Sequence, residues 1–279
     1  MQKYIFSGEL RDESQGISVS NRAFRYADGL FESMYYTANK IMFLDQHYAR
    51  LKAGMKLLRI DDKNMPSTDE FLKECQKLLA ENSIADGARI RLQIFRKEGG
   101  LYLPDNDQCD YIIETSAMAN SEYSLNTKGL HIGISNSIKR NADIFSQVKT
   151  TSKYEMVLVA MDARDHKWDD AILMNNHDNI VETSSSNIFA VINGNIYTPA
   201  ITDGALNGIM RKNIIRIANH NNISVIETTL NESNLLAADE VFITNAVKGI
   251  QWVVAFGNKR YFNAVSKRLT SLLNKEIYE

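Results

Sequence analysis

The chain has 279 residues, which is long for one domain and comfortable for two. Hydrophobic residues make up 44% of it and charged residues 24%, so we expect a packed core and no long disordered tract. The formal net charge is −2 and no basic run exceeds a few residues, so the sequence does not indicate binding to nucleic acid.

The sequence carries no sign of export, membrane insertion or metal binding. No apolar run approaches the roughly 18 residues that a membrane-spanning helix needs, and the N-terminus has no long apolar segment typical of a signal peptide. Cys75 and Cys109 are far apart and lack C-x-x-C spacing, which is typical of reduced thiols in the cytoplasm. No histidine or acid cluster has the spacing of a metal site. We therefore expect a cytoplasmic protein that binds neither membranes nor metal.

Short strands and turns are expected in the first 43 residues. Asp28-Gly29 is a turn signal between two aromatic, strand-prone runs, and Asn39-Lys40 is a second hairpin signal. The sequence therefore predicts extended segments at 4–6, 17–21, 22–27, 30–36 and 41–43.

Two helices and two strands are expected in the rest of the first half. Asp45 can cap a helix that reaches residue 58 and places three apolar residues on one face. Ser67 or Thr68 can cap a second helix, which runs to residue 82. Residues 89–96 alternate apolar and polar side chains as a half-buried strand does, and a further strand is expected at 111–113.

Residues 120–128 have a loop composition, so we expect them to link a small N-terminal α/β domain, 1–119, to a larger domain, 129–279. Hairpins come first and alternating elements later, which predicts a mixed α/β (α+β) fold. Strands in the second domain are expected at 130–134, 171–174, 188–192, 196–197, 224–227, 241–244 and 252–256. Helices are expected at 153–165, 208–219 and 232–236, and from residue 264 onward.

The polar stretch at residues 182–187 is unusual for the edge of a plain strand. Glu182 is followed by four hydroxyl residues and Asn187, and such groups need backbone, water or a ligand as partners. Lys149 lies in a polar turn before a helix, and Gly208 opens another helix. An amine, a carboxylate and a helix N-terminus are what a pyridoxal-phosphate site requires.

The motifs resemble the class-IV aminotransferase family, the fold-type IV pyridoxal-phosphate enzymes. Its members include branched-chain and D-amino-acid aminotransferases and 4-amino-4-deoxychorismate lyase. The resemblance implies the two-domain architecture of the D-amino-acid aminotransferase type, a homodimer and a small amino substrate. The matching segments are 25–32, His47 with Arg50-Leu51, Lys149, 182–187, 207–211, and 238–240 with 244–246.

The resemblance also implies roles for individual residues. Lys149 would be the Schiff-base lysine and would move the proton at the substrate α-carbon. Glu182 would face the pyridine nitrogen of pyridoxal 5'-phosphate, and Arg50 would hold its phosphate. The remaining cofactor-binding candidates are Tyr154, Ser186, Asn187, Gly208, Ile209, Met210, Asn245 and Ala246. The substrate-binding candidates are Phe31, Tyr35, Arg91 and Tyr102.

Two departures from the family pattern affect these roles. Met210 stands where aminotransferases usually have threonine, so backbone N–H groups of Ile209 and Met210 must serve the phosphate. The loop at 97–102 lacks the arginine–histidine pair with which D-amino-acid enzymes hold the substrate carboxylate.

Each candidate also has a purely structural interpretation. Lys149 could be an ordinary solvated lysine, with Lys153 equally eligible by composition. Arg50 could pair with Asp45 or with solvent on a helix surface, and Glu182 could be a strand-edge acid. Tyr154 could pack its helix, and Asn207-Gly208 could be a common helix start. A cofactor-free binding protein with the same fold is then the alternative to an enzyme.

Two reactions fit the motifs. Residues 207–211, 238–240 and 244–246 favour the lyase, which eliminates pyruvate from aminodeoxychorismate and leaves 4-aminobenzoate for folate synthesis. Tyr154 favours the branched-chain aminotransferases. From the sequence we place the lyase first, with a branched-chain or D-amino-acid aminotransferase as the alternative.

Overall fold

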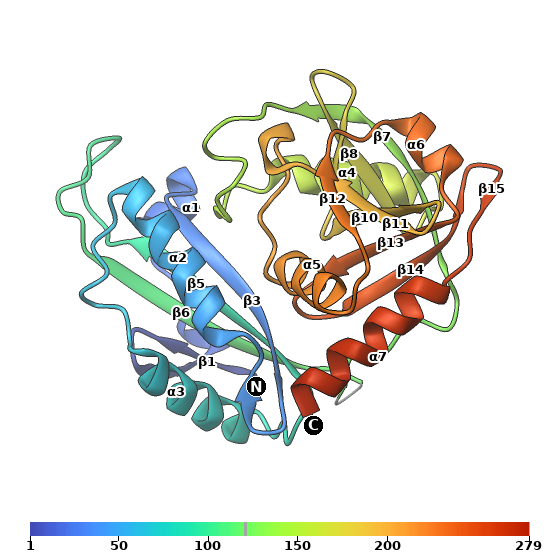
Figure 1. Cartoon of the computed structure of the whole chain (residues 1–279). Helices are drawn as coiled ribbons and strands as arrows, with labels where there is room; N and C mark the ends of the chain where they lie inside the picture. The colour runs from blue at the N-terminus through green and yellow to red at the C-terminus, as the bar shows by residue number, and fades with distance from the viewer. Residues whose placement is uncertain (120–121, 279) are drawn as a thin grey trace. The chain divides into compact units, whose positions relative to one another are not determined.

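The computed structural model describes residues 1–119 and 122–278, and the chain folds into two units (Figure 1). The N-terminal unit contains Met1–Glu122 together with Val148–Ser152, and the C-terminal unit contains Tyr123–Gln147 and Lys153–Glu279. The segment with Lys149 thus belongs to the N-terminal unit, although the sequence placed it in the C-terminal domain. Residues 120 and 121 of the expected linker lie outside the described residues, as does residue 279.

A six-stranded sheet in the order β2-β1-β6-β5-β3-β4 forms the N-terminal unit, and all its strand pairs are antiparallel. The strands are β1 (Lys3–Phe6), β2 (Glu9–Asp12), β3 (Gly29–Thr37), β4 (Lys40–Ile41), β5 (Ala88–Arg96) and β6 (Cys109–Ala117). The alternation predicted for β5 is confirmed, because Ile90, Leu92 and Ile94 are fully buried in the core. Arg91 and Gln93 point to the opposite face.

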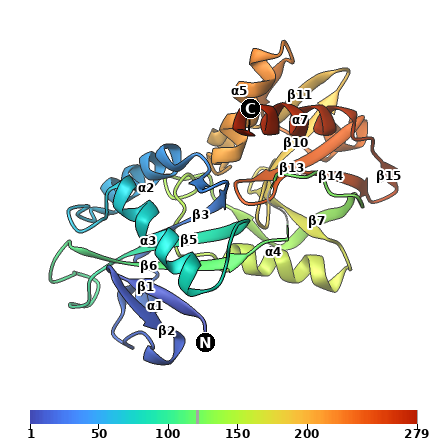
Figure 2. The same cartoon turned by 90° about the horizontal axis from the view of Figure 1, so that it is seen from below.

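Helices α2 (Leu44–Leu58) and α3 (Thr68–Glu81) contact each other and cover the apolar face of this sheet (Figure 2). The Ser67 cap of α3 is confirmed, and it forms a capping box with Glu70. The Asp45 cap of α2 is wrong. That helix begins at Leu44, with Phe43 in a left-handed conformation as its N-cap residue, two residues before the predicted cap, and no side chain of the described chain caps it.

The segment before β3 also differs from the prediction. Arg22–Tyr26 forms a short helix, α1, because the Asn21 side chain accepts a hydrogen bond from the Phe24 N–H and caps it. The helix ends at Ala27, with φ 52°, and β3 begins at Gly29. Local capping therefore overrides the strand propensity of the aromatic residues. Residues 17–21, all of them described, form no strand; a short 3-10 helix, η1 (Glu13–Gln15), precedes them.

A nine-stranded sheet forms the C-terminal unit, in the order β12-β11-β10-β13-β14-β7-β8-β9, with β15 beside β14. The strands are β7 (Leu130–Arg140), β8 (Asp170–Asn175), β9 (Ile180–Thr183), β10 (Asn187–Ile192), β11 (Asn195–Pro199), β12 (Val225–Thr228), β13 (Glu240–Asn245), β14 (Gly249–Phe256) and β15 (Lys259–Arg260). The sequence missed β9, which pairs antiparallel with β8 and carries Glu182 opposite Leu173.

The helices of this unit agree with the predicted ones within a residue or two. They are α4 (Tyr154–Asp165), α5 (Ile209–His220), α6 (Glu232–Ala237) and α7 (Ala264–Tyr278). The sequence did not predict the short 3-10 helix η2 (Ile201–Asp203). In Figure 1, α7 runs beside α5, and the two helices are in contact. Helix α4 packs on β8 through Val159 and Ala163. Across residues 1–119 and 122–278, no helix combines the length and apolarity needed to span a membrane.

Candidate active site

Lys149 is held beside the beginning of β3. The backbone N–H of Phe31 donates to the Lys149 carbonyl at 3.0 Å, and the N–H of Thr151 donates to the Gly29 carbonyl at 2.9 Å. Leu30 and Thr150 form a β-bridge between these two hydrogen bonds. The lysine therefore lies in a loop by sequence but has the fixed backbone of a strand edge. Its Nζ lies 4.6 Å from the centroid of the Phe31 ring, a cation–π distance.

Arg91 contacts the same aromatic ring. Its guanidinium carbon lies 4.1 Å from the Phe31 centroid. Burial lowers the pKa of Arg91 from its ordinary value, and Glu114 only partly opposes this. Glu114 is half exposed and lies 3.4 Å from the guanidinium, so it is a weak counter-ion. The structure thus brings together three predicted residues, the amine of Lys149, the ring of Phe31 and a guanidinium suited to a carboxylate.

The other two substrate candidates have different environments. Tyr35 follows Phe31 by four residues on β3, so both side chains lie on the same face of the sheet, and Tyr35 is fully buried. Tyr102 lies in the loop between β5 and β6 and is 90% exposed. Its ring contacts Tyr26, with 5.7 Å between centroids.

Arg50 pairs with Glu32, on the opposite face of β3 from Phe31. Glu32 accepts hydrogen bonds from Nε of Arg50 at 2.8 Å and from Nη2 at 2.5 Å, and its Oε2 lies 2.7 Å from Nδ1 of His47. The structure thus gives Arg50 a buried partner, Glu32, that the sequence did not indicate. The motif at 25–32 contains Glu32, but no sequence signal showed that it would face α2.

The Glu32 cluster is buried and ionic. Burial alone would raise the pKa of Glu32, but the charge of Arg50 and the contact with His47 outweigh it and lower the pKa to about 2. Burial lowers the pKa of His47, and Glu32 only partly opposes this. A neutral His47 would donate through Nδ1 to Glu32, and its buried Nε2 has no hydrogen-bond partner within the described part of the chain.

Glu182 lies in β9 in the C-terminal unit and is buried. Its Oε1 accepts a hydrogen bond from Nη1 of Arg140 at 2.5 Å, and its Oε2 accepts one from the Leu206 N–H at 3.2 Å. Arg140, the last residue of β7, also donates to Glu155 at 2.9 Å and to the Gly204 carbonyl at 3.2 Å. Burial lowers the pKa of Arg140, but the charges and hydrogen bonds of Glu182 and Glu155 together outweigh it, so the pKa is raised. Both carboxylate oxygens of Glu182 are thus held in place.

Sequence reasoning missed Arg140. It is far from Glu182 along the chain, and only the parallel pairing of β7 with β8, followed by the β8–β9 hairpin, brings the two side chains together. The one available signal was a basic pair, Lys139-Arg140, at the end of an extended segment that was predicted to be shorter than it is.

The N-terminus of α5 has no side-chain cap among the described residues, and its backbone is closely packed at Gly208. The N-cap residue is Gly208, and no described side chain caps the helix. A Cβ at position 208 would lie 2.0 Å from Oδ1 of Asn187, so only glycine fits there. The Asn187 side chain donates to the Leu206 carbonyl at 2.8 Å and so fixes the turn before the helix. Ile209 and Met210 have buried side chains, which leaves their backbone N–H groups as the polar atoms of this turn.

Ser186 and Asn245 lie on the neighbouring strands β10 and β13 or at their ends. Nδ2 of Asn245 donates to Oγ of Ser186 at 3.0 Å, and the register pairs Asn187 with Thr244. Oγ1 of Thr244 is buried and has no partner among the residues that the structure describes. The Ala246 carbonyl accepts a hydrogen bond from Tyr123 at 2.8 Å. Residues from two separate predicted motifs, 182–187 and 244–246, are thus linked within one unit.

Tyr154 is the first residue of α4 and is 63% exposed. The interpretation of Tyr154 as a residue that packs its helix is not supported, because Val159 and Ala163 form the buried side of α4. Its hydroxyl can therefore reach a ligand without leaving a packed core.

Comparisons with known proteins agree with this arrangement. The sequence matches the family described as amino-transferase class IV over residues 29–256. It is 31% identical, over 252 residues, to a putative branched-chain-amino-acid aminotransferase from Methanocaldococcus jannaschii. This match covers 89% of this chain and 85% of that protein. It is 22% identical, over 236 residues, to an aminodeoxychorismate lyase from Vibrio harveyi, with coverage of 84% and 85%.

The fold matches a crystal structure of the branched-chain aminotransferase from Thermoproteus uzoniensis with norvaline. The TM-score is 0.88 at 23% sequence identity, and the match covers 99% of this chain and 97% of that one. The chain belongs to the class IV aminotransferase family. It is a pyridoxal-phosphate-dependent enzyme, an aminotransferase or a lyase, so the resemblance and the fold-type IV architecture predicted from the sequence are confirmed.

The residues present fit pyridoxal 5'-phosphate. When bound, this cofactor supplies an aldehyde that reacts with amines and a pyridinium ring that withdraws electrons from the substrate. The C-terminal unit offers a buried carboxylate fixed by Arg140, a helix N-terminus without a side-chain cap, and a buried Thr244 hydroxyl without a partner, as far as residues 1–119 and 122–278 show. The N-terminal unit offers the amine of Lys149 and the guanidinium of Arg50. A carboxylate suits the ring nitrogen of the cofactor, a guanidinium and a helix N-terminus suit its phosphate, and an amine suits its aldehyde.

Proposed function

We propose that the protein is an aminotransferase for α-amino acids with branched-chain side chains. The observation that carries this proposal is the contact of Lys149 and Arg91 with one Phe31 ring. An amine beside a guanidinium suits a substrate that bears a carboxylate next to its reacting carbon. Arg91 binds that carboxylate in this proposal, while Lys149 removes and returns the proton at the α-carbon.

We infer the cofactor-binding roles from the two units separately. Glu182 faces the pyridine nitrogen, and Arg140 holds the Glu182 carboxylate in place. In the N-terminal unit, Arg50, held by Glu32, carries the charge that suits a phosphate. In the C-terminal unit, the N–H groups of Ile209 and Met210 at the start of α5 suit a phosphate.

The remaining candidates complete the cofactor site. In this proposal Ser186, Asn187, Asn245 and Ala246 line it beside α5, and Gly208 allows close approach of the backbone. The Tyr154 hydroxyl would donate a hydrogen bond to the ring oxygen of the cofactor. On the substrate side, Tyr35 and Tyr102 join Phe31 and Arg91.

The order of the two reactions changes from the one that the sequence favoured. The branched-chain relative from Methanocaldococcus jannaschii is 31% identical, whereas the lyase from Vibrio harveyi is 22% identical. The loop 97–102 lacks the arginine–histidine pair that would bind a substrate carboxylate, and Arg91 offers a guanidinium for this role. The lyase is the second candidate, and residues 207–211 and 244–246 together with the Vibrio relative support it.

An assay with three substrates separates the candidates. The purified protein, saturated with pyridoxal 5'-phosphate, is supplied with L-leucine and 2-oxoglutarate, with D-alanine and 2-oxoglutarate, or with aminodeoxychorismate. We expect glutamate to form with L-leucine. Formation of 4-aminobenzoate and pyruvate, with no glutamate from L-leucine, would overturn the proposal in favour of the lyase. Turnover of D-alanine alone would make the protein a D-amino-acid aminotransferase.

We also propose that the protein is a cytoplasmic homodimer. Buried free thiols at Cys75 and Cys109 suit a reducing compartment. Val157 and Met161 are exposed on α4 at helical spacing, and such apolar surface is typical of a protein interface. Light scattering on the purified chain should give twice the mass of one chain; a monomer at micromolar concentration would contradict the dimer.

A further inference from the structure

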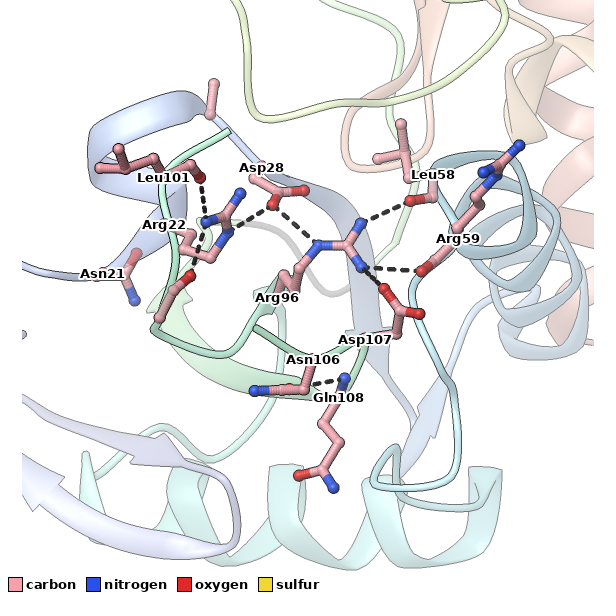
Figure 3. Close-up of polar contacts among 12 residues, drawn as sticks. Asn21, Arg22, Asp28, Leu58, Arg59, Arg96, Leu101, Asn106, Asp107 and Gln108 are labelled. Carbon is pink, nitrogen blue, oxygen red and sulfur yellow. Dashed lines mark hydrogen bonds and ion pairs between the residues drawn. The ribbon is translucent and has the colours of Figure 1, made fainter. Parts of the chain in front are cut away.

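One carboxylate holds two buried arginines in the N-terminal unit. Oδ2 of Asp28 accepts hydrogen bonds from Nε of Arg22 at 2.8 Å and from Nε of Arg96 at 3.0 Å (Figure 3). The side chains of Arg22 and Arg96 are 4% and 7% exposed, and that of Asp28 is 17% exposed. Asp107 also contacts Arg96 but is 66% exposed, so Asp28 is the main partly buried anion for both cations.

Each of the two guanidinium groups that Asp28 holds also donates hydrogen bonds to backbone carbonyls. Nη1 of Arg22 donates to Gly99 at 2.9 Å and to Leu101 at 2.7 Å, both in the loop 97–108 between β5 and β6. Nη1 of Arg96 donates to Arg59 at 2.9 Å, and Nη2 donates to Leu58 at 2.6 Å. The loop and the C-terminal end of α2 are therefore fixed from the same carboxylate, as Figure 3 shows.

The loop 97–108 is also restrained from within. Gly99 and Gly100 have φ values of 120° and 70°, which residues with a side chain rarely adopt. A Cβ on Gly100 would lie 2.1 Å from the Leu103 carbonyl. The Lys97 N–H donates to the Gln108 carbonyl at 2.8 Å and closes the base of the loop. These restraints select one loop conformation.

The tip of this restrained loop is apolar and exposed. Leu101, Tyr102 and Leu103 are 72%, 90% and 84% exposed. The Arg22 guanidinium lies 5.0 Å from the centroid of the Tyr26 ring, which in turn contacts Tyr102. Arg22 thus fixes the tip twice, through the backbone and through the aromatic pair. An exposed apolar surface that is held in place suits the recognition of an apolar ligand, because little freedom is lost on binding.

We propose that Asp28 is a positioning residue for substrate selection: through Arg22 and Arg96 it holds the loop 97–108 so that its apolar tip favours substrates with large apolar side chains. This proposal rests on the proposed function, in which Tyr102 belongs to the substrate side. It adds that the preference depends on residues that do not contact the substrate themselves. The hydrogen bonds that Arg22 and Arg96 donate to the loop and to the end of α2 form an arginine clamp. Loss of this clamp should therefore loosen the loop and weaken the substrate preference together.

The test compares Arg22→Lys with the control Arg25→Lys. Lysine keeps the positive charge beside Asp28 but lacks the fork that reaches two carbonyls at once. Arg25 lies on the same short helix, is exposed, and donates to the Val19 carbonyl. In the cofactor-loaded enzyme, Arg22→Lys should speed amide hydrogen exchange in the loop about tenfold, and the control should not. The ratio of kcat/KM for L-leucine to that for L-alanine should fall about tenfold in Arg22→Lys alone.

Two further variants keep the test decisive. Gly100→Ala disturbs the loop from within and leaves the arginines intact, so it should give the same loss of preference even if Arg22→Lys does not fold. Tyr102→Ser should lower the preference while the exchange of the loop amides stays slow. Faster exchange with an unchanged ratio would overturn the proposal and leave the proposed function standing. A wild-type enzyme without turnover of either amino acid would overturn the proposed function, whereas unchanged exchange in Arg22→Lys would overturn the clamp alone.

Discussion

The amine of Lys149 lies 4.6 Å from the centre of the Phe31 ring, and the backbone N–H of Phe31 donates to the Lys149 carbonyl at 3.0 Å. One residue of β3 thus holds the lysine both at its backbone and at the end of its side chain. This arrangement exists because Val148–Ser152 belongs to the N-terminal unit, although the residues on both sides of this segment belong to the other unit.

Lys149→Ala should abolish the covalent attachment of the cofactor, whereas Lys153→Ala should leave it intact. Lys149 is fixed beside Phe31, while Lys153 is the N-cap residue of α4 in the C-terminal unit. Each variant is mixed with pyridoxal 5'-phosphate, reduced with borohydride and digested, and the modified peptide is identified by mass. A modified peptide that contains Lys153 but not Lys149 would show that the lysine assignment is wrong.

Arg91→Met should weaken the use of amino-acid substrates much more than Arg89→Met. Both arginines lie on the same face of β5, but Arg91 contacts the Phe31 ring while Arg89 donates to Ser33 at 3.4 Å. Removal of one partner of a charge-assisted pair costs about 2–3 kcal/mol, which is a loss of about 30- to 150-fold in kcat/KM. Steady-state kinetics with L-leucine measure the effect, and equal losses in both variants would argue against a carboxylate at Arg91.

Arg140 and Glu182 should depend on each other for stability. Arg140→Gln leaves a buried carboxylate with only the Leu206 N–H as a partner, so we expect a loss of about 3–5 kcal/mol in the free energy of unfolding. Glu182→Gln leaves the guanidinium to Glu155 and should cost less, because Glu155 still compensates the charge. The double variant should be more stable than the sum of the two losses predicts, by 1 kcal/mol or more in a denaturant-based double-mutant cycle. Additive losses would show that the ion pair is not coupled.

The fold could be predicted from the sequence where local and tertiary signals agree. In β5 the apolar alternation matches the buried face, and in α3 Ser67 and Glu70 form the cap that their spacing predicts. At α1 the aromatic residues favoured a strand, but the Asn21 cap and the contacts of Arg22 with Asp28 and the 97–108 loop produce a helix. The cap and the strand propensity are both local signals, and the aromatic pattern alone did not show that the cap would prevail.

The candidate site could be predicted only in part. Motif spacing identified Lys149 and Glu182, because the types of residue around them are unusual. It did not identify Arg140 as the partner of Glu182, or Glu32 as the partner of Arg50, because strand pairing and helix packing decide those contacts. Charged residues that are buried against a partner look like ordinary surface charges in a sequence.

Glu32→Gln should lower both stability and affinity for the phosphate group. The folded-state pKa of Glu32 is lowered from 4.5 to about 2 through Arg50 and His47, although burial opposes this. Its contribution to stability is therefore present above pH 4.5 and is lost as the pH falls toward 2. Glu32→Gln should remove that part of the acid dependence and weaken pyridoxal 5'-phosphate binding, measured by titration of the apoenzyme. Asp45→Asn, on helix α2 with Arg50 and His47, should change neither.

His47 should make the protein less stable at mildly acidic pH. Burial lowers its folded-state pKa from the ordinary 6.5. At mildly acidic pH the unfolded chain therefore binds a proton at His47 that the folded chain does not bind. Stability from the neutral ring is complete above pH 6.5 and decreases as the pH falls, with a slope of up to about 1.4 kcal/mol per pH unit. His47→Gln keeps a donor for Glu32 but does not titrate, so its free energy of unfolding should change less between pH 7.5 and pH 5 (roughly the range in which an unperturbed histidine titrates). Urea unfolding of both proteins at several pH values measures the difference, and parallel curves would show that folding does not lower the pKa of His47.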